Sequence, residues 1–554
     1  MKTPTSSIIY RLISLMTGLL MAVFSVNVHA QISQGGQPYS FSHRLEMPRV
    51  LSPDRTELQY KNLVENKSCS ALEFARFLPL NEPLSSKHWQ IISDEDGRTL
   101  YRIAIQSEGA LAIGAYFNDC YLPPGSRLFI YSPDKKQLIG AFTSQNNHSS
   151  GLFATEYILG DELVIEYEEP IAVQGQGHFT ISEILYAYRD VRLFSEEKGY
   201  GGSGDCEVNV NCPEGNGKKN QRDAVLRLLI KNGSSGTWCT GSLVNNTKED
   251  RTPYVITADH CGKNSSADDH EQWVFYFHYQ SWGCANPENE PAHKTMEGCI
   301  EIAASSKADV QGSDFYLVQL LQDIPETYNP YFLGWNRDGL GSSEGFTIHH
   351  PQGDIKKISH YAQDLQDASY AQGFPKAYWE VLWSETSTGF GVTEPGSSGS
   401  PLFDKDGYLI GTLTGGGASC STQTAPDYYG KFSEHWMSNG DADDQQLRPW
   451  LDPLNLGVDK MDGVYMGVDE QKLVANQLFQ AIPNPATSYL NIYFNQNAGN
   501  FHIQISDLSG SRIKEYDVSG NASYRIDMSK FSRGVYIVSV TEGKTIQYQK
   551  VTKL

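Results

Sequence analysis

Glu394-Pro395-Gly396-Ser397-Ser398-Gly399-Ser400-Pro401-Leu402-Phe403 is a glycine- and serine-rich turn that runs directly into an apolar strand. Glycines on both sides of a serine permit a tight bend, which exposes the hydroxyl and brings backbone N–H groups together beside it. A serine hydroxyl reacts poorly at neutral pH unless a neighbouring base takes its proton. Ser398 is therefore a candidate nucleophile, with the N–H groups of Gly396 and Ser398 as its oxyanion hole.

A candidate base lies upstream, in Thr257-Ala258-Asp259-His260-Cys261. His260 titrates near neutral pH, so it can accept the serine proton and return it later. The ring needs a carboxylate to orient it, and Asp314 is the best candidate because it precedes an apolar strand; Asp309 is the alternative, without a comparable strand. Taken singly, each residue has a structural explanation as a turn, a core histidine or a strand cap. The order histidine, aspartate, serine favours a catalytic triad.

Two adjacent histidines, His349 and His350, precede Pro351 and raise the question of a metal site. Neighbouring residues on a strand point to opposite faces, and no carboxylate cluster accompanies the pair, so a structural role is favoured. No Cys-x-x-Cys pair suggests zinc. The sequence predicts neither a metal nor a cofactor.

Length and composition indicate an exported protein of several domains. The chain has 554 residues, of which 39% are hydrophobic, and a formal net charge of −21 that argues against a nucleic-acid partner. Residues 1–30 have the pattern of a signal peptide: Lys2 and Arg11 are basic, 12–24 is largely apolar, and small residues precede Gln31. Nine cysteines suit disulfides in an oxidising compartment, and their odd number leaves at least one unpaired.

Short alternating segments divided by turn residues predict an all-β protein with three regions after the signal peptide. Residues 31–198 contain no catalytic pattern and are predicted to be a β-rich propeptide, which ends before a glycine-rich boundary. Residues 199–465 carry the candidate site and begin with the hairpin pattern of 225–244. Residues 476–554 are predicted to form a small β-sandwich.

The region from Gly201 to about Asp462 resembles the lysyl endopeptidases, a bacterial group of chymotrypsin-like serine proteases. The resemblance rests on the stretches quoted above and on others, such as Cys212-Pro213-Glu214-Gly215 and Asp427-Tyr428-Tyr429-Gly430. It implies two β-barrels with the triad in the cleft between them. It also implies three disulfides and leaves Cys299 over; the pairs are Cys206–Cys420, Cys212–Cys284 and Cys239–Cys261. A Cys69–Cys120 bond suits the upstream region, but nothing in the sequence requires it.

The same resemblance bears on the substrate. Asp427 matches the family's aspartate that recognises a cationic side chain, and a carboxylate at the base of a narrow pocket favours an ammonium or guanidinium. The alternative is that Asp427 is an ordinary loop acid. Thr414, Gly415, Gly416 and Tyr370 are expected to border the cleft; Thr414 stands where the family has a histidine, and Tyr370 where it has a tryptophan. These departures leave the choice between lysine and arginine open.

The C-terminal region resembles the sorting domain of the type IX secretion system of Bacteroidetes. The matching stretches are Pro483-Asn484-Pro485-Ala486, Leu490-Asn491-Ile492, Asp507-Leu508-Ser509-Gly510 and Gly534-Val535-Tyr536-Ile537-Val538. The resemblance implies recognition by outer-membrane secretion machinery and passage to the cell surface or medium by way of the periplasm. The alternative is an adhesive β-sandwich.

These observations predict a secreted serine endopeptidase that cuts polypeptides after lysine, with cleavage after arginine left open, and that is monomeric when mature. The alternatives are a trypsin-like enzyme of broader or arginine-preferring specificity and a non-catalytic surface adhesin. Lys198 precedes the glycine-rich boundary, so an enzyme that cuts after lysine is expected to release its own propeptide there. Trypsin-like zymogens bind the new amino terminus with an aspartate just before the nucleophile, and Ser397 stands at that place here. We therefore expect the propeptide to act as a folding aid or inhibitor.

Overall fold

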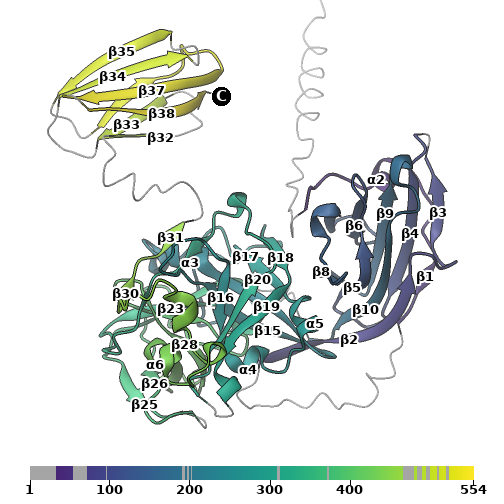
Figure 1. Ribbon diagram of the computed structural model, residues 1–554, viewed down its shortest axis with the longest axis horizontal. Coiled ribbons are helices and arrows are strands. Elements are labelled where there is room, and N and C mark those ends of the chain that lie inside the picture. The colour runs from purple at the N-terminus through teal and green to yellow at the C-terminus, as the bar shows by residue number, and fades with distance from the viewer. Residues whose placement is uncertain are drawn as a thin grey trace, which may run out of the picture. The chain divides into compact units, whose positions relative to one another are not determined.

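The structure is a computed structural model of the whole chain (Figure 1). It describes residues 33–53, 71–94, 96–189, 194–195, 199–200, 202–308, 312–370, 373–465, 479–482, 489–494, 500–507, 511–519, 523–543 and 545–553. The chain divides into two compact units, Met1–Met466 and Gly467–Leu554. Among the described residues, no helix is both long and apolar enough to cross a membrane. The proposed signal peptide, Lys198, Asp309 and Cys69 lie outside the described residues.

Two sheets pack face to face in the N-terminal part of the first unit. One sheet contains β1 (Val50–Leu51), β3 (Gln90–Ser93), β4 (Thr99–Gln106), β6 (Arg127–Tyr131), β7 (Leu138–Phe142) and β9 (Glu162–Glu169). The facing strands are β2 (Leu72–Pro83), β5 (Ala112–Tyr121), β8 (Phe153–Leu159) and β10 (His178–Ala187). Alternate apolar residues of both groups, including Ile103, Phe117 and Ile165, form one buried core, as expected of a sandwich.

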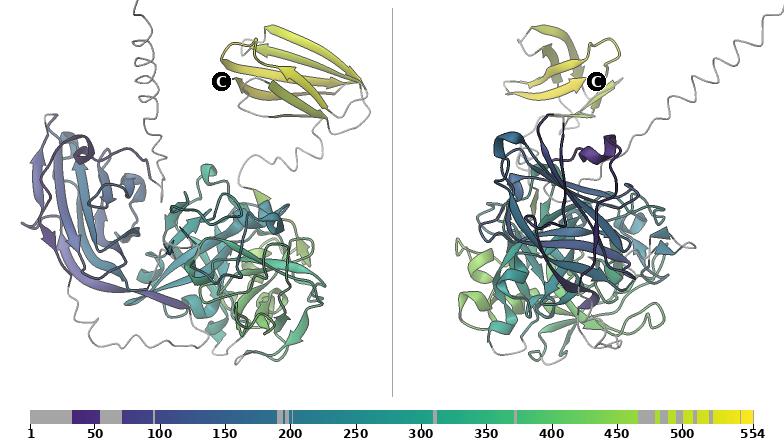
Figure 2. Two further views of the ribbon diagram at one scale, coloured as in Figure 1. Left: turned by 180° about the vertical axis from the view of Figure 1, so that it is seen from behind. Right: turned by 90° about the vertical axis from the view of Figure 1, so that its right-hand side faces the viewer.

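The sheet that contains β2, β5, β8 and β10 continues into the region of the candidate site through a second set of strands. It contains β14 (Val225–Asn232), β15 (Ser235–Leu243), β16 (Tyr254–Thr257), β17 (Val274–Phe277), β18 (Lys294–Glu297), β19 (Cys299–Ala304) and β20 (Tyr316–Leu320). The hairpin expected over 225–244 is present as β14 and β15, which are joined by Gly233 and Ser234. Strand β15 also pairs with β2, so one sheet of eleven strands spans both regions (Figures 1 and 2).

A ten-stranded sheet forms the other half of the candidate-site region. It contains β13 (Val208–Asn209), β22 (Trp335–Asn336), β23 (Gly345–His349), β24 (Lys357–Tyr361), β25 (Gln366–Ala368), β26 (Tyr378–Val381), β27 (Pro401–Asp404), β28 (Leu409–Gly416), β29 (Asp427–Lys431) and β30 (Lys460–Met461). A core that includes Val381, Leu402 and Tyr429 fills it. The mostly antiparallel sheets confirm the all-β prediction.

Short elements complete the first unit. The helices are α2 (Tyr39–Ser42), α3 (Lys219–Ala224), α4 (Asp259–Gly262), α5 (Ala267–His270), α6 (Phe432–Met437) and α7 (Arg448–Leu451). Two strand pairs join β11 (Phe194–Ser195) to β12 (Gly199–Tyr200) and β21 (Tyr331–Phe332) to β31 (Val464–Tyr465).

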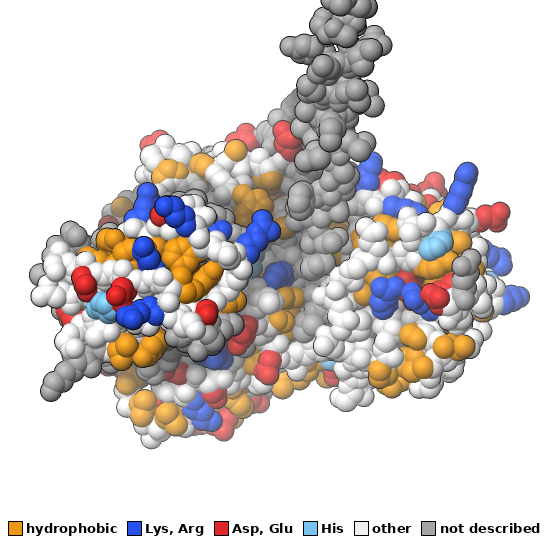
Figure 3. Space-filling view, turned by 90° about the horizontal axis from the view of Figure 1, so that it is seen from above, with side chains coloured by type: hydrophobic (Ala, Val, Ile, Leu, Met, Phe, Trp, Pro, Cys, Tyr) orange, Lys and Arg blue, Asp and Glu red, His pale blue; other side chains and the backbone are white. Residues whose placement is uncertain are grey.

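The second unit has two antiparallel sheets. One contains β32 (Phe479–Ile482), β33 (Tyr489–Phe494) and β36 (Ser523–Asp527); the other contains β34 (Asn500–Asp507), β35 (Arg512–Ser519), β37 (Gly534–Glu542) and β38 (Thr545–Lys553). Residues from both sheets, including Leu490, Ile503 and Val538, share one buried core. The described strands are therefore those of a small β domain. Figure 3 shows basic and acidic side chains interspersed on the face in view.

Three disulfides are present, and they are the three that the family resemblance implied. They join Cys206 to Cys420, Cys212 to Cys284 and Cys239 to Cys261. Cys299 is a buried free thiol, and so is Cys120 among the described residues. Because Cys69 lies outside those residues, its bond to Cys120 stays a prediction.

Candidate active site

His260 lies at the end of an inner strand, where two contacts fix its backbone. Strand β16 ends at Thr257, and His260 follows within the short helix α4. Cys261 bonds to Cys239 on β15, which ties α4 to the neighbouring strand. The backbone of His260 is therefore fixed by a strand on one side and by a disulfide on the other.

Asp314 contacts His260 through both of its carboxylate oxygens. The backbone N–H of His260 donates to Oδ1 at 3.0 Å, and Nδ1 of the ring lies 2.9 Å from Oδ2. Asp314 sits just before β20 in the left-handed region, with φ of 63°, and its carbonyl accepts from Asp259 N at 3.2 Å. This backbone conformation is uncommon for a residue with a side chain, and it persists where the surrounding structure demands it.

The two groups shift each other's titration in opposite directions. Burial alone would lower the pKa of His260, but the Asp314 carboxylate raises it above its ordinary value. Burial alone would raise the pKa of Asp314, yet the charge and N–H groups of His260, together with Thr414, hold it below its ordinary value. The pair therefore favours a charged carboxylate beside an imidazole that readily accepts a proton.

The turn that carries Ser398 packs against the segment that carries His260. The carbonyl of Ser398 accepts from Thr240 N at 2.8 Å and lies 3.9 Å from the sulfur of Cys261. A Cβ placed on Gly399 would lie 2.7 Å from the N of Ala258, so only glycine permits this approach. The candidate nucleophile and base are thus neighbours although 138 residues separate them in the sequence.

Three groups among the described residues at this junction have free hydrogen-bonding capacity. Within the described residues, the N–H groups of Gly396 and Ser398 donate no hydrogen bond, and Gly396 has φ of 95°. Nε2 of His260 is buried and has no partner among the same residues. An acceptor atom for a proton and two donors for an oxyanion therefore lie on the two segments that meet here.

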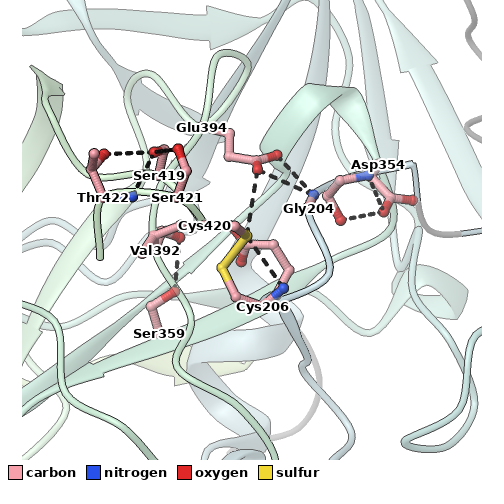
Figure 4. Close-up of a disulfide and its surroundings, with 12 residues drawn as sticks. Gly204, Cys206, Asp354, Ser359, Val392, Glu394, Ser419, Cys420, Ser421 and Thr422 are labelled. Carbon is pink, nitrogen blue, oxygen red and sulfur yellow. Dashed lines mark hydrogen bonds between the residues drawn. A yellow bond between two sulfur atoms is a disulfide. The ribbon is translucent and has the colours of Figure 1, made fainter. Parts of the chain in front are cut away.

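The segment just before Ser398 is tied to the beginning of the candidate-site region. Figure 4 shows the Glu394 carboxylate facing Gly204 N, at 3.1 and 3.2 Å, beside the Cys206–Cys420 disulfide. The hydroxyl of Ser397 lies 2.8 Å from Nδ1 of His349, which is fully buried. Glu394 and the disulfide thus fix the loop from one side and His349 supports it from the other.

The paired histidines make separate contacts in the interior. Nε2 of His349 lies 3.1 Å from the Ser359 hydroxyl, and Nδ1 of His350 lies 2.8 Å from the Asp354 carbonyl. Burial lowers the pKa of both rings, and that of His349 falls to about 3. Across the described residues, no group of three or more His, Cys, Asp or Glu side chains is placed to hold a metal ion.

Asp427 is a carboxylate enclosed by hydrogen-bond donors. Its side chain belongs to β29, and the residue is 1% exposed. Oδ2 accepts from Trp383 Nε1 at 2.6 Å and from the Thr393 hydroxyl at 2.7 Å, while Oδ1 accepts from Ala418 N at 3.2 Å. Burial raises its pKa to about 6, although these donors oppose the shift.

The other residues expected along the cleft lie around Asp427 and Asp314. Gly416 pairs with Asp427 across two strands, and a Cβ there would lie 2.0 Å from its Oδ1, so glycine makes room for the carboxylate. Gly415 pairs with Tyr428, and Tyr370 stacks on the Tyr428 ring with centroids 4.3 Å apart. Thr414 lies on the same strand, β28, and near Asp314, as its effect on the pKa of Asp314 indicates.

Trp383 was not among the candidate site residues taken from the sequence. It lies 44 residues before Asp427 and reaches it only because β26 pairs with β29. Thr393 immediately precedes the quoted stretch around Ser398, yet no local pattern marks its role beside Asp427. Trp383 lies two residues beyond a buried strand, and no local sequence pattern marks it as a partner of Asp427.

Known proteins match this chain in the two regions just described. Residues 200–430 match the family "Lysyl endopeptidase, C-terminal domain". Residues 200–430 form a serine endopeptidase domain that is similar to those of the lysyl endopeptidases. A lysyl endopeptidase of Pseudomonas aeruginosa is 26% identical over 367 residues, which cover 63% of this chain and 76% of that protein.

Two solved proteases are among the similar structures. The protease Anisep from Arthrobacter nicotinovorans has a TM-score of 0.27 and 17% identity, and the match covers 38% of this chain and 90% of that one. A Glu endopeptidase in complex with MPD has a TM-score of 0.25 and 13% identity, over 41% of this chain and 93% of the other.

The C-terminal unit of this endopeptidase has a match of its own. Residues 480–553 match the family "Secretion system C-terminal sorting domain". The chain therefore carries a sorting domain of the type IX secretion system and is an extracellular or cell-surface protein. Polypeptides are the substrates of the endopeptidase domain, and the secretion machinery is a partner of the sorting domain.

Proposed function

We propose that this endopeptidase hydrolyses peptide bonds on the carboxyl side of lysine, with Ser398 as nucleophile, His260 as base and acid, and Asp314 as the group that orients the ring. The observation that carries the proposal is the double contact of Asp314 with His260 beside the Ser398 turn. A carboxylate that binds both the ring and the backbone fixes the tautomer in which Nε2 accepts a proton.

The chemistry follows from this arrangement. His260 Nε2 takes the proton of the Ser398 hydroxyl as the oxygen attacks the scissile carbonyl. The developing negative charge lies on the carbonyl oxygen, where the N–H groups of Gly396 and Ser398 stabilise it. The imidazolium then protonates the leaving amine, and an acyl-enzyme remains on Ser398. Water, deprotonated by His260, attacks the acyl group and releases the acid product.

Lysine selection is assigned to Asp427. Its carboxylate is almost completely buried and retains acceptor capacity on Oδ1, which suits a single ammonium group. A side chain at position 416 would displace that carboxylate, and Gly416 has none. The second candidate is a broader or arginine-preferring specificity, which the departures at Thr414 and Tyr370 favour.

Residues 31–198 are assigned as a propeptide that acts as a folding aid or inhibitor, and 199–465 as the mature protease. Contacts between the two parts support this role. Strand β2 adds to β15, and Phe74 stacks on Trp238 with centroids 4.3 Å apart. Two ion pairs accompany the strand contact: Lys231 with the partly exposed Glu183 at 3.0 Å, and the buried pair of His293 with Glu156 at 2.8 Å.

The proposal extends to maturation and export. A signal peptide over 1–30 directs the chain to the periplasm, cleavage after Lys198 by the enzyme itself frees the propeptide, and the mature enzyme is a monomer. A Ser398→Ala precursor expressed in a protease-deficient host is expected to remain uncut at this boundary. Normal maturation of that precursor would refute self-processing.

The catalytic assignment is tested by labelling the secreted protein with a fluorophosphonate and mapping the modified peptide. The adduct is expected on Ser398 and on neither Ser397 nor Ser400, which serve as internal controls in the same peptide. His260→Ala is expected to abolish labelling while the thermal midpoint shows that the chain is folded. Labelling that survives Ser398→Ala, or that falls on another serine, would refute the assignment.

A further inference from the structure

We propose that Trp383 and Thr393 make Asp427 selective for lysine over arginine by occupying one of its two carboxylate oxygens. The inference rests on the proposed function, since it presupposes that Asp427 receives the substrate's cationic side chain. It adds two specificity-determining residues, which act through Asp427 and not by contact with the substrate.

The hydrogen bonds to Asp427 are distributed unequally between its two oxygens. Oδ2 receives Trp383 Nε1 at 2.6 Å and the Thr393 hydroxyl at 2.7 Å. A carboxylate oxygen has about two lone-pair positions, so these donors fill Oδ2. Among the described residues, the hydrogen bond to Oδ1 comes from Ala418 N, at 3.2 Å, so this oxygen retains an acceptor position. The backbone N–H of Thr393 also acts on the carboxylate and lowers its pKa.

Lysine and arginine place different demands on such a carboxylate. An ammonium is a compact charge that needs one acceptor, and the open position of Oδ1 supplies it. A guanidinium gains most from a bidentate contact in which two N–H groups meet both oxygens side by side. That contact is blocked here because Oδ2 already has its two donors. The carboxylate keeps its charge but offers a single point of attachment.

Neither donor can turn away easily, because both lie in packed surroundings. Trp383 is 3% exposed, and its ring meets Tyr429 edge-on with centroids 6.2 Å apart. Thr393 is 5% exposed and follows Val392, whose carbonyl accepts from the Ser359 hydroxyl at 3.0 Å. Rotation of either side chain toward a substrate would break a buried hydrogen bond, so Oδ2 stays occupied when substrate enters.

The glycine beside Asp427 fixes which oxygen remains available. A Cβ on Gly416 would lie 2.0 Å from Oδ1, so this oxygen lies against the backbone of β28 at the end that also carries Thr414 and Gly415. Oδ2 lies on the other branch of the carboxylate, with Trp383 and Thr393. The open acceptor and the segment expected to border the cleft are therefore on the same side of Asp427.

The test measures kcat/KM for three peptide substrates that are identical except for lysine, arginine or norleucine before the scissile bond. Trp383→Phe removes the N–H and keeps an aromatic ring, and Thr393→Val removes the hydroxyl and keeps the shape. Each is expected to raise the arginine-to-lysine ratio of kcat/KM about tenfold, since hydrogen bonds to charged groups have effects of this size. Thr393→Ser keeps a hydroxyl and is expected to keep the low ratio.

Trp379→Phe is the matched control. Trp379 is buried on β26 and donates its Nε1–H to the Ile410 carbonyl at 3.1 Å, so this change also removes one buried indole N–H but leaves Asp427 untouched. The ratio is expected to stay at its wild-type value in this variant. Active-site titration with a fluorophosphonate normalises every rate to folded, reactive enzyme. If Trp383→Phe does not fold, the comparison of Thr393→Val with Thr393→Ser decides the question.

The outcomes separate this inference from the proposed function. An unchanged ratio in Trp383→Phe and Thr393→Val, with lysine preference still lost in Asp427→Asn, would refute the role of the two donors and leave Asp427 as selector. Lysine preference that survives Asp427→Asn would refute the selector itself. A rise of the ratio in Trp379→Phe equal to that in Trp383→Phe would also overturn the inference, because the effect would then not depend on Asp427.

Discussion

Replacing Asp427 by asparagine is the most informative single change in the proposed pocket. The substitution removes one negative charge and replaces one acceptor oxygen by an NH2 group of nearly equal size. In the wild type, three donors from Trp383, Thr393 and Ala418 converge on the carboxylate. An amide has a single oxygen, so one side of the group must place N–H against N–H or O–H, whichever way it turns.

The cost for a lysine substrate follows from this burial. Asp427 is 1% exposed, so an ammonium that binds to it is removed from water and depends on the carboxylate for compensation. Loss of one partner from a buried ion pair costs about 3–5 kcal/mol. We therefore expect kcat/KM for the lysine substrate to fall by about 10²- to 4 × 10³-fold, at about 1.4 kcal/mol for each factor of ten.

The assay compares lysine with norleucine, which has the same aliphatic chain without the ammonium. The rate for norleucine is expected to change little in Asp427→Asn, because its side chain makes no ionic contact. Active-site titration corrects for unfolded enzyme. An equal loss for both substrates would indicate general damage to the site, and a preserved lysine preference would refute Asp427 as selector.

Three further predictions concern the titrating groups. Because burial raises the pKa of Asp427 to about 6, its carboxylate is charged above that pH and neutral below it. The lysine-to-norleucine ratio of kcat/KM is therefore expected to fall as pH drops through about 6, since protonation of His260 slows both substrates equally and cancels in the ratio. A ratio independent of pH would contradict the assignment. Asp314→Asn is expected to lower kcat by about 10⁴-fold through loss of the correct histidine tautomer, as pre-steady-state kinetics will measure, and a loss below about tenfold would contradict its role. Pairing with Glu156 raises the pKa of His293 although burial alone would lower it. The pair therefore stabilises the fold below the ordinary histidine pKa, and this contribution to stability is lost as pH rises through the raised pKa of His293. In a full-length Ser398→Ala chain, the drop in thermal midpoint caused by Glu156→Gln is expected to be larger at pH 5.5 than at pH 9, and an equal drop at both would exclude the ion pair as its cause.

Local sequence patterns predicted much of the fold. The hairpin of β14 and β15 was predicted from a turn rich in glycine and serine between two apolar runs. Alternating residues and turn spacing indicated the all-β class. The family resemblance, and not spacing, supplied the three disulfide pairs.

Contacts between distant strands were beyond such patterns. Strand β2 joins the edge of β15, and neither strand contains a residue that specifies its partner, since backbone groups make the bonds. The donors to Asp427 are similar, because Trp383 reaches it through the pairing of β26 with β29. The sequence marks reactive side chains well, whereas the residues that orient them are marked only by the fold.

The central claim is that Ser398, activated by His260 and Asp314, is the nucleophile that cuts polypeptides. The cut follows the residue that Asp427 selects. Digestion of an unstructured protein with the secreted enzyme, followed by mass-spectrometric mapping of every cut, tests it most directly. The account predicts cuts after lysine, loss of all cuts in Ser398→Ala and loss of the lysine preference in Asp427→Asn. Cuts after neutral residues in the wild type, or cuts that persist in Ser398→Ala, would contradict it.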